Sequence, residues 1–191
     1  MNLKNLYLDD ALFTFLDVET TGLSSKKDRI CEIAMSGYKN FNKVYFFSSL
    51  VNPQIPIPPD IVKLNGIDDN LVADKPVFSS LIPAIVSRIE DSVLVGHNIN
   101  FDVAFLENEF QRAGFNFPKL LTVDTWKMAV KMGKFRSNKL GDIAKRLGIS
   151  CENWHRAASD IEMTRQIFEH FTVILKKDGI STVKELIKAA Q

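Results

Sequence analysis

The amino-acid sequence predicts an α/β protein in which a mixed sheet of five strands is flanked by helices. Most strand-like segments come early in the chain and most helical segments come late. In the middle of the chain, strand-like and helical segments alternate. A composition of 46% hydrophobic and 25% charged residues is typical of a soluble globular protein. At 191 residues the chain fits one domain, residues 1–191, with a substantial core.

The predicted strands are bounded apolar segments, the third of them rich in the aromatic and β-branched residues that strands favour. They cover residues 12–18, 30–38, 44–51, 92–95 and 121–123. The segment 52–59 contains four prolines, which interrupt regular strand pairing, so we expect it to run extended over the surface.

The predicted helices occupy most of the second half of the chain. They cover residues 60–64, 77–89, 100–113, 125–132, 139–147, 156–175 and 182–190. Asn65 and Gly66 close the first of them, and Gly114 stops the third. Pro83 lies inside 77–89, where it can kink the helix or end it early.

Bulk charge and cysteine content exclude several classes of protein. The formal net charge of +1 favours neither nucleic acid nor membrane, so only local charge can indicate a partner. Two cysteines do not make a disulfide scaffold, and the N-terminus lacks the basic start and apolar core of a signal peptide. No apolar run approaches the roughly 18 residues of a membrane span. We therefore expect a cytoplasmic protein without membrane contact.

Asp17 and Glu19 lie in the stretch LDVETTGL, at the end of the first predicted strand. Because strand side chains alternate, both carboxylates point to the same face of the sheet. Burying an ionised carboxylate is unfavourable unless a cation or a hydrogen-bond donor compensates it. Either this face is solvated, or a metal ion lies opposite the pair.

Two further stretches, VGHNINFD and WHRAASD, place acidic residues at the starts of helices. Asp102 falls in the first turn of its helix, where an aspartate also complements the helix dipole. His155 and Asp160 are five residues apart, about 140° around a helix. They converge only if His155 lies in the loop before the helix, and otherwise each is an ordinary solvated side chain.

Taken together, these four carboxylates and one histidine indicate metal-dependent chemistry. Hard divalent cations such as Mg²⁺ are bound by oxygen ligands. Two such ions about 3.5–4 Å apart activate a water and stabilise the leaving oxygen in phosphodiester cleavage. A histidine with a pKa near 6.5 suits the role of general base.

The stretches FLDVETTGL, GHNINFD and HRAASD resemble the three motifs of the DEDDh exonucleases, the DnaQ-like proofreading group. The resemblance covers about residues 12–171, so the predicted C-terminal helix at about 182–190 lies outside it. Within the family, the chain most resembles the proofreading type of the DNA polymerase III epsilon subunit. It implies an RNase H-like fold and 3′→5′ hydrolysis of single-stranded DNA ends to nucleoside 5′-monophosphates. It also implies that Asp17, Glu19, Asp102 and Asp160 bind two Mg²⁺ or Mn²⁺ ions and that His155 is the general base.

The same resemblance implies contacts to the substrate. Thr20, Thr21 and Leu23 would border the terminal nucleotide, and Phe101 and Ile67 would supply apolar contact to the terminal bases. For Phe101 and Ile67, packing in the core is an equal alternative.

Three alternatives for function stay open at this point. The first is an exonuclease that trims RNA 3′ ends instead of DNA. The second concerns the DNA exonuclease itself, which is either the proofreading subunit of a polymerase or a freestanding relative. The third is a binding module without catalysis, although all five motif residues are present. Between residues 126 and 147, seven basic residues accompany one acidic residue, Asp142, and they either guide a phosphate backbone or form a solvated face.

Overall fold

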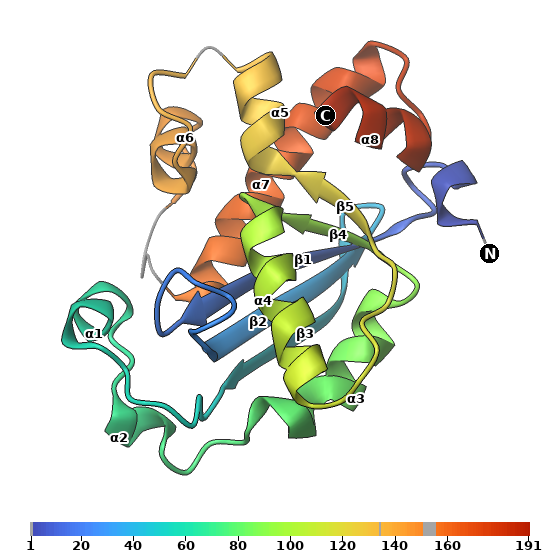
Figure 1. Ribbon diagram of the computed structural model, residues 1–191. Coiled ribbons are helices and arrows are strands. Elements are labelled where there is room, and N and C mark those ends of the chain that lie inside the picture. Colours follow the sequence, from blue (N-terminus) through green and yellow to red (C-terminus); the bar gives the residue numbers. More distant parts are fainter. Residues whose placement is uncertain (1, 134, 151–155) are drawn as a thin grey trace.

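The computed structural model describes residues 2–133, 135–150 and 156–191. In these ranges five strands form one mixed sheet in the order β3-β2-β1-β4-β5 (Figure 1). The antiparallel part consists of β1 (Leu12–Thr20), β2 (Ile30–Lys39) and β3 (Asn42–Leu50). The short strands β4 (Val93–Gly96) and β5 (Leu121–Asp124) continue the sheet in parallel with β1. The predicted fold class is confirmed.

Helices cover both faces of the sheet, with α4 in front of it and α7 behind it in Figure 1. A 3₁₀ turn at Leu3–Asn5 precedes them. The helices are α1 (Pro59–Asn65), α2 (Asp69–Val72), α3 (Phe78–Ile89), α4 (Ile99–Arg112), α5 (Thr125–Met132), α6 (Leu140–Arg146), α7 (Ala157–Lys177) and α8 (Val183–Ala190). Within the described ranges, none of these helices combines the length and apolar character needed to cross a membrane.

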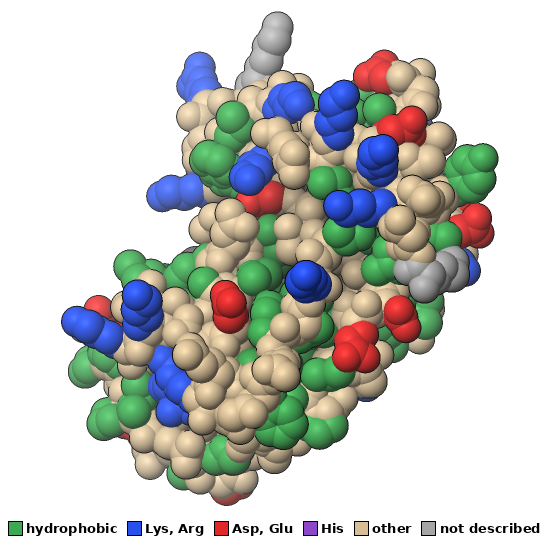
Figure 2. All heavy atoms as spheres, turned by 45° about the vertical axis from the view of Figure 1, so that its right-hand side comes forward, with side chains coloured by type: hydrophobic (Ala, Val, Ile, Leu, Met, Phe, Trp, Pro, Cys, Tyr) green, Lys and Arg blue, Asp and Glu red, His purple; other side chains and the backbone are tan. Residues whose placement is uncertain are grey.

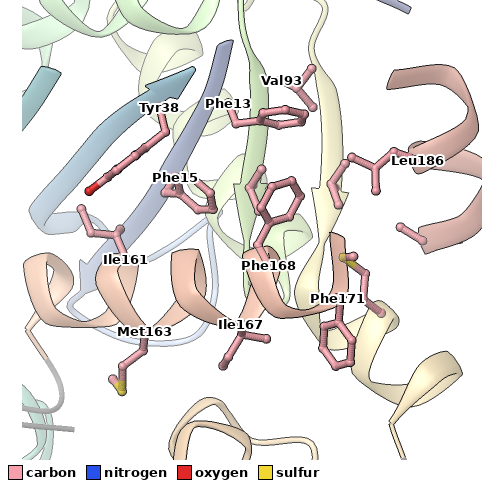
Figure 3. Packing of buried hydrophobic residues seen from close by; sticks show 14 of the residues in the cluster. Phe13, Phe15, Tyr38, Val93, Ile161, Met163, Ile167, Phe168, Phe171 and Leu186 are labelled. Atoms are coloured by element: carbon pink, nitrogen blue, oxygen red, sulfur yellow. The ribbon is translucent and has the colours of Figure 1, made fainter. Parts of the chain in front are cut away.

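The two faces of β1 enter two different cores. Side chains alternate along a strand, so Phe13 and Phe15 join the cluster under α7, whereas Leu16 and Val18 join the cluster under α3 and α4. Phe168 of α7 packs between the first pair, with ring centroids 5.0 Å from Phe13 and 5.4 Å from Phe15 (Figure 3). This alternation also determines on which side of the sheet the acidic residues at the end of β1 emerge.

Every predicted strand and helix is present, with ends that differ from the prediction by one or two residues at most. Gly66 and Gly114 adopt left-handed conformations, with φ of 74° and 76°, which confirms the predicted stops of the helices before them. The four-residue helix α2 was not predicted because it is too short to show a periodic pattern. Asp68 caps it by accepting a hydrogen bond of 2.8 Å from the Leu71 amide.

Helix α3 continues through Pro83 to Ile89, so of the two possibilities for this proline the early end does not occur. A proline inside a helix removes one backbone hydrogen bond. Here Phe78, Ile82, Ile85 and Ile89 bury the apolar side of α3 against the sheet. We attribute the continuity of the helix to this burial, which offsets the lost hydrogen bond.

Phe168→Ala should destabilise the fold by about 3–5 kcal/mol, because it removes a large side chain from between two strand phenylalanines and leaves a cavity. The matched control is Val173→Ala on the same helix, where the side chain is 45% exposed and the expected change stays within about 0.5 kcal/mol. Urea unfolding followed by circular dichroism measures both. Equal effects of the two substitutions would contradict the placement of α7.

Candidate active site

Three carboxylates from two separate elements converge at the C-terminal end of β1. Asp17 and Glu19 share the strand face of Phe13 and Phe15, which is the face that α7 covers. Asp160 lies in the first turn of α7. The ligand oxygens of Asp17, Glu19 and Asp160 all lie within 4.8 Å of one another. The structure therefore brings together residues that are about 140 positions apart in the chain.

Asp102 stands beside this set and is attached to the backbone of the same strand. It lies in the first turn of α4, which follows β4, the parallel neighbour of β1. Its Oδ1 accepts a hydrogen bond of 3.1 Å from the Val18 amide, between Asp17 and Glu19. This bond fixes the start of α4 to the acidic end of β1.

Burial and mutual repulsion raise the pKa values of these carboxyl groups. The pKa of Asp17 lies well above its usual range, because of burial first and then of the charges of Asp102 and Asp160. Burial also raises the pKa of Asp102 to about 8. The pKa of Glu19 rises to about 7 through burial, although an amide hydrogen bond of 3.3 Å from Asn65 opposes the shift.

This site fits a divalent cation. Asp17, Glu19 and Asp160 offer only carboxylate oxygens, which are the ligands that Mg²⁺ and Mn²⁺ prefer. The raised pKa values show that the negative charges are poorly compensated, and a bound cation would relieve that repulsion. These three residues could hold a divalent cation, with Asp102 next to them.

His155 lies outside the described residues, as do Lys134 and Trp154. Helix α7 begins at Ala157, so His155 precedes the helix in the chain while Asp160 lies within it. The convergence of His155 with Asp160 therefore stays a prediction.

The predicted nucleotide-contacting residues of the first motif lie at the end of β1 and in the turn that follows it. Thr20 Oγ1 donates a hydrogen bond of 2.6 Å to the Gly22 carbonyl, and Thr21 Oγ1 accepts one of 3.0 Å from the Arg29 amide. Both threonines are buried, whereas Leu23 is 85% exposed. The threonine side chains thus hold the turn, and Leu23 is the member of the three that is free to contact a ligand.

Phe101 and Ile67 differ in what they expose. Phe101 is partly buried and packs on Phe105, with ring centroids 4.8 Å apart. Ile67 is fully buried in a small core cluster with Cys31 and Ile57. The apolar surroundings of Ile67 favour the core alternative for it, because a buried side chain offers no surface to a base.

A cleft of about 590 Å³ adjoins the carboxylates, and sequence reasoning missed most of its wall. It is lined by Asp17, His97, Asn98, Trp126, Asn138, Lys139, Leu140 and Asp160. His97 connects the start of α5 to the segment before α6, with its Nδ1 3.0 Å from Thr125 Oγ1 and its Nε2 2.8 Å from the Asn138 carbonyl oxygen. The position of Trp126 at the start of a basic segment was the available signal in the sequence, since aromatic and basic residues together are typical of nucleic-acid sites. In the structure this tryptophan is 42% exposed.

The model of the RNase_T exonuclease family matches residues 14–168. This chain belongs to the exonuclease family. The family prediction made from the three motifs, and the enzyme class that goes with it, are therefore confirmed.

Curated relatives share the sequence over nearly the whole chain. Identity is 35% over 91% of this chain to the DNA polymerase III PolC-type of Caldanaerobacter subterraneus. It is 33% over 94% of this chain to the 3′-5′ exonuclease DinG of Bacillus subtilis. The match spans only 12% of the first protein and 19% of the second, so this exonuclease sequence corresponds to a small part of each.

Solved structures share the fold. Exonuclease X in complex with 5′ overhanging duplex DNA matches with a TM-score of 0.73 and 23% identity, covering 94% of this chain and 99% of that one. Exonuclease I of E. coli in complex with a dT13 oligonucleotide matches with a TM-score of 0.75 and 20% identity, covering 86% of this chain and 41% of that one. The predicted RNase H-like arrangement is confirmed by these matches.

Asp17→Asn should stabilise the metal-free protein above neutral pH, where removing one buried charge relieves the repulsion. A carboxyl group with a raised pKa in the folded state binds more protons folded than unfolded, so its contribution to stability falls as pH rises from about 4 through the folded value. We expect a melting temperature about 2–4 °C higher at pH 8 in EDTA, corresponding to about 1 kcal/mol, and no difference near pH 4.

Differential scanning fluorimetry across this pH range measures the effect, with Asp91→Asn at an exposed position as the control. Adding Mg²⁺ or Mn²⁺ should stabilise the wild type more than Asp17→Asn. A variant that melts below the wild type at pH 8 without metal would contradict this account.

Proposed function

We propose that this chain is a metal-dependent 3′→5′ exonuclease that hydrolyses single-stranded DNA ends to nucleoside 5′-monophosphates. One observation carries the proposal: Asp17, Glu19 and Asp160 bring their ligand oxygens within 4.8 Å of one another in a member of the exonuclease family. The oxygen-only ligand set and the cleft beside it suit the hydrolysis of a phosphodiester.

In this proposal Asp17, Glu19, Asp102 and Asp160 hold two Mg²⁺ or Mn²⁺ ions. Bound there, the ions supply Lewis-acid stabilisation of the phosphate charge and a more acidic attacking water. The chain itself holds the ligands in place before any ion arrives, because β1, α4 and α7 each carry part of the set on a packed element.

His155 is the proposed general base that takes a proton from the attacking water. An imidazole with a pKa near 6.5 changes protonation near neutral pH, which suits it to accept that proton and release it later. Leu23 and Phe101 are the proposed apolar contacts to the terminal nucleotide. Leu23 lies in the turn that Thr20 and Thr21 hold, and Phe101 lies at the start of α4.

The names of the relatives and neighbours support DNA as the substrate. The exonuclease I neighbour was solved with a dT13 oligonucleotide and exonuclease X with overhanging duplex DNA. Several relatives are PolC-type DNA polymerases, of which this chain matches about an eighth. We therefore propose that the chain serves proofreading or DNA repair in the cytoplasm, as one exonuclease domain over residues 1–191 that acts with a DNA polymerase.

A basic surface next to the cleft supports a polyanionic substrate. Lys139 lines the cleft itself, and Arg136 and Arg146 line a second pocket of about 600 Å³, whose lining includes the residues just before Asn138 in the chain. Figure 2 shows lysine and arginine side chains gathered over the upper part of the molecule. In this proposal these cations guide the phosphate backbone past a site that is itself acidic.

Incubation with 5′-labelled single-stranded DNA should give a ladder that shortens from the 3′ end in Mg²⁺ or Mn²⁺ and not in EDTA. Asp160→Ala should lower kcat at least about 10³-fold, since it removes a metal ligand, whereas the exposed Asp91→Ala should behave as the wild type. Faster shortening of the matching RNA would redirect the proposal to RNA trimming, and no cleavage of either would refute it.

His155→Gln should lower kcat by about 10²–10⁴-fold, the usual contribution of a general base, while Mn²⁺ binding stays close to that of the wild type. Single-turnover kinetics and isothermal titration calorimetry separate the two effects. Loss of metal binding together with activity would instead indicate that His155 supports the ligand set.

A further inference from the structure

Glu32 on β2 is a buried carboxylate that adjoins the four candidate ligands at the acidic end of the sheet. It is paired across the β1–β2 ladder with Glu19, and only 3% of it is exposed. Its charge adds to the repulsion that raises the pKa values of Asp17 and Glu19. Glu32 thus makes the site less favourable to form, yet it is not one of the three converging carboxylates. Its presence there needs a separate explanation.

Within the described ranges, the side-chain hydrogen bonds of Glu32 lead to the beginning of α7. Arg156 donates from Nε to Oε2 at 3.1 Å and from Nη2 to Oε1 at 2.8 Å, a two-pronged contact with the carboxylate. The Ala157 amide donates a third hydrogen bond of 3.2 Å to Oε2. Both oxygens of Glu32 are therefore occupied by N–H donors instead of being turned toward the other carboxylates.

Glu32 does for α7 what a capping side chain does at the start of other helices. The first amides of a helix have no partner within the helix, and a nearby side-chain oxygen usually accepts from one of them. Arg156 occupies the N-cap position of α7 and its own side chain makes no capping bond. The acceptor comes instead from β2, 125 residues earlier in the chain, and its negative charge also suits the helix N-terminus.

The same contacts continue to Asp160. The Arg156 carbonyl accepts hydrogen bonds from the Ser159 amide at 2.8 Å and from the Asp160 amide at 3.1 Å. Arg156 is thus bonded to the sheet through its side chain and to the metal-ligand candidate through its backbone. A chain of direct contacts runs from β2 through Glu32 and Arg156 to Asp160.

We propose that Glu32 is a positioning residue that fixes the first turn of α7 to the sheet and thereby holds Asp160 in register with Asp17 and Glu19. It acts through the guanidinium of Arg156 and the amide of Ala157, and it touches neither metal nor substrate. The expected effect of Glu32 on kcat rests on the proposed nuclease function. Its expected effect on the first turn of α7 rests on the geometry alone.

The chain contains a matched control for this arrangement. Glu109 on α4 is 2% exposed and accepts from Arg29 Nε at 2.7 Å and Arg29 Nη2 at 3.0 Å. The Ile30 amide lies 3.4 Å from the same carboxylate. This pair joins α4 to the start of β2 and leaves Asp160 untouched, so it resembles the Glu32 contact in chemistry but not in location.

The experiment compares Glu32→Gln with Glu109→Gln by hydrogen exchange and steady-state kinetics. In Glu32→Gln the amides at the start of α7 should exchange at least about tenfold faster, because opening of that turn becomes easier. Its kcat on single-stranded DNA should fall about 10–100-fold, the usual effect of losing a partner that orients a metal ligand, with KM within about threefold. Glu109→Gln should lose a similar amount of thermal stability and keep both the exchange of α7 and kcat near the wild type.

Arg156→Lys tests geometry against charge, at a side chain that is 45% exposed and therefore tolerant of substitution. Lysine keeps the positive charge but cannot make the two parallel hydrogen bonds. We expect its kcat to fall as in Glu32→Gln, and a wild-type kcat would overturn positioning in favour of simple charge compensation. Unchanged exchange of α7 in Glu32→Gln, or an equal loss of kcat in Glu109→Gln, would also overturn it. An inactive wild type would refute the nuclease function, and the exchange data would still decide the role of Glu32.

Discussion

Repulsion among carboxylates gathered at one end of β1 is the constraint on which the rest of this structure depends. Asp17, Glu19, Asp102 and Asp160 come from three elements, and burial and mutual repulsion raise the pKa values of the first three. No local sequence preference would assemble them, because each addition makes the folded protein without metal less stable. The packing of the sheet against its helices has to supply the opposing free energy.

That packing comes from the apolar half of the same strand. Residues of β1 that alternate toward α7 begin as Phe13 and Phe15 and end as Asp17 and Glu19, so one face passes from core to site within a few residues. Phe168 packs α7 onto the first pair, about two turns from Asp160 on the same helix. The apolar contacts that stabilise the fold therefore also hold the acidic residues against their repulsion.

Hydrogen bonds to the backbone complete the arrangement where apolar packing ends. Asp102 accepts from the Val18 amide, which ties α4 to β1, and Glu32 accepts from Arg156 and the Ala157 amide, which ties α7 to β2. In both cases the carboxylate accepts hydrogen bonds from a different element: Asp102 from the backbone of β1, and Glu32 from the beginning of α7. Such directional bonds define position more narrowly than apolar contact does, which is what a set of metal ligands requires.

The sequence by itself determined the local structure and named the carboxylates that the candidate site brings together. Strand alternation placed Asp17 and Glu19 on one face, glycines marked the ends of two helices, and three motifs assigned the family, because each of these signals acts within a few neighbouring residues. Only the tertiary structure decided that Asp160 meets the first pair, that Ile67 belongs to the core, and that Glu32 holds the start of α7. Those outcomes depend on partners more than 100 residues away or on burial by other elements, and no local pattern records which distant segment a side chain will meet.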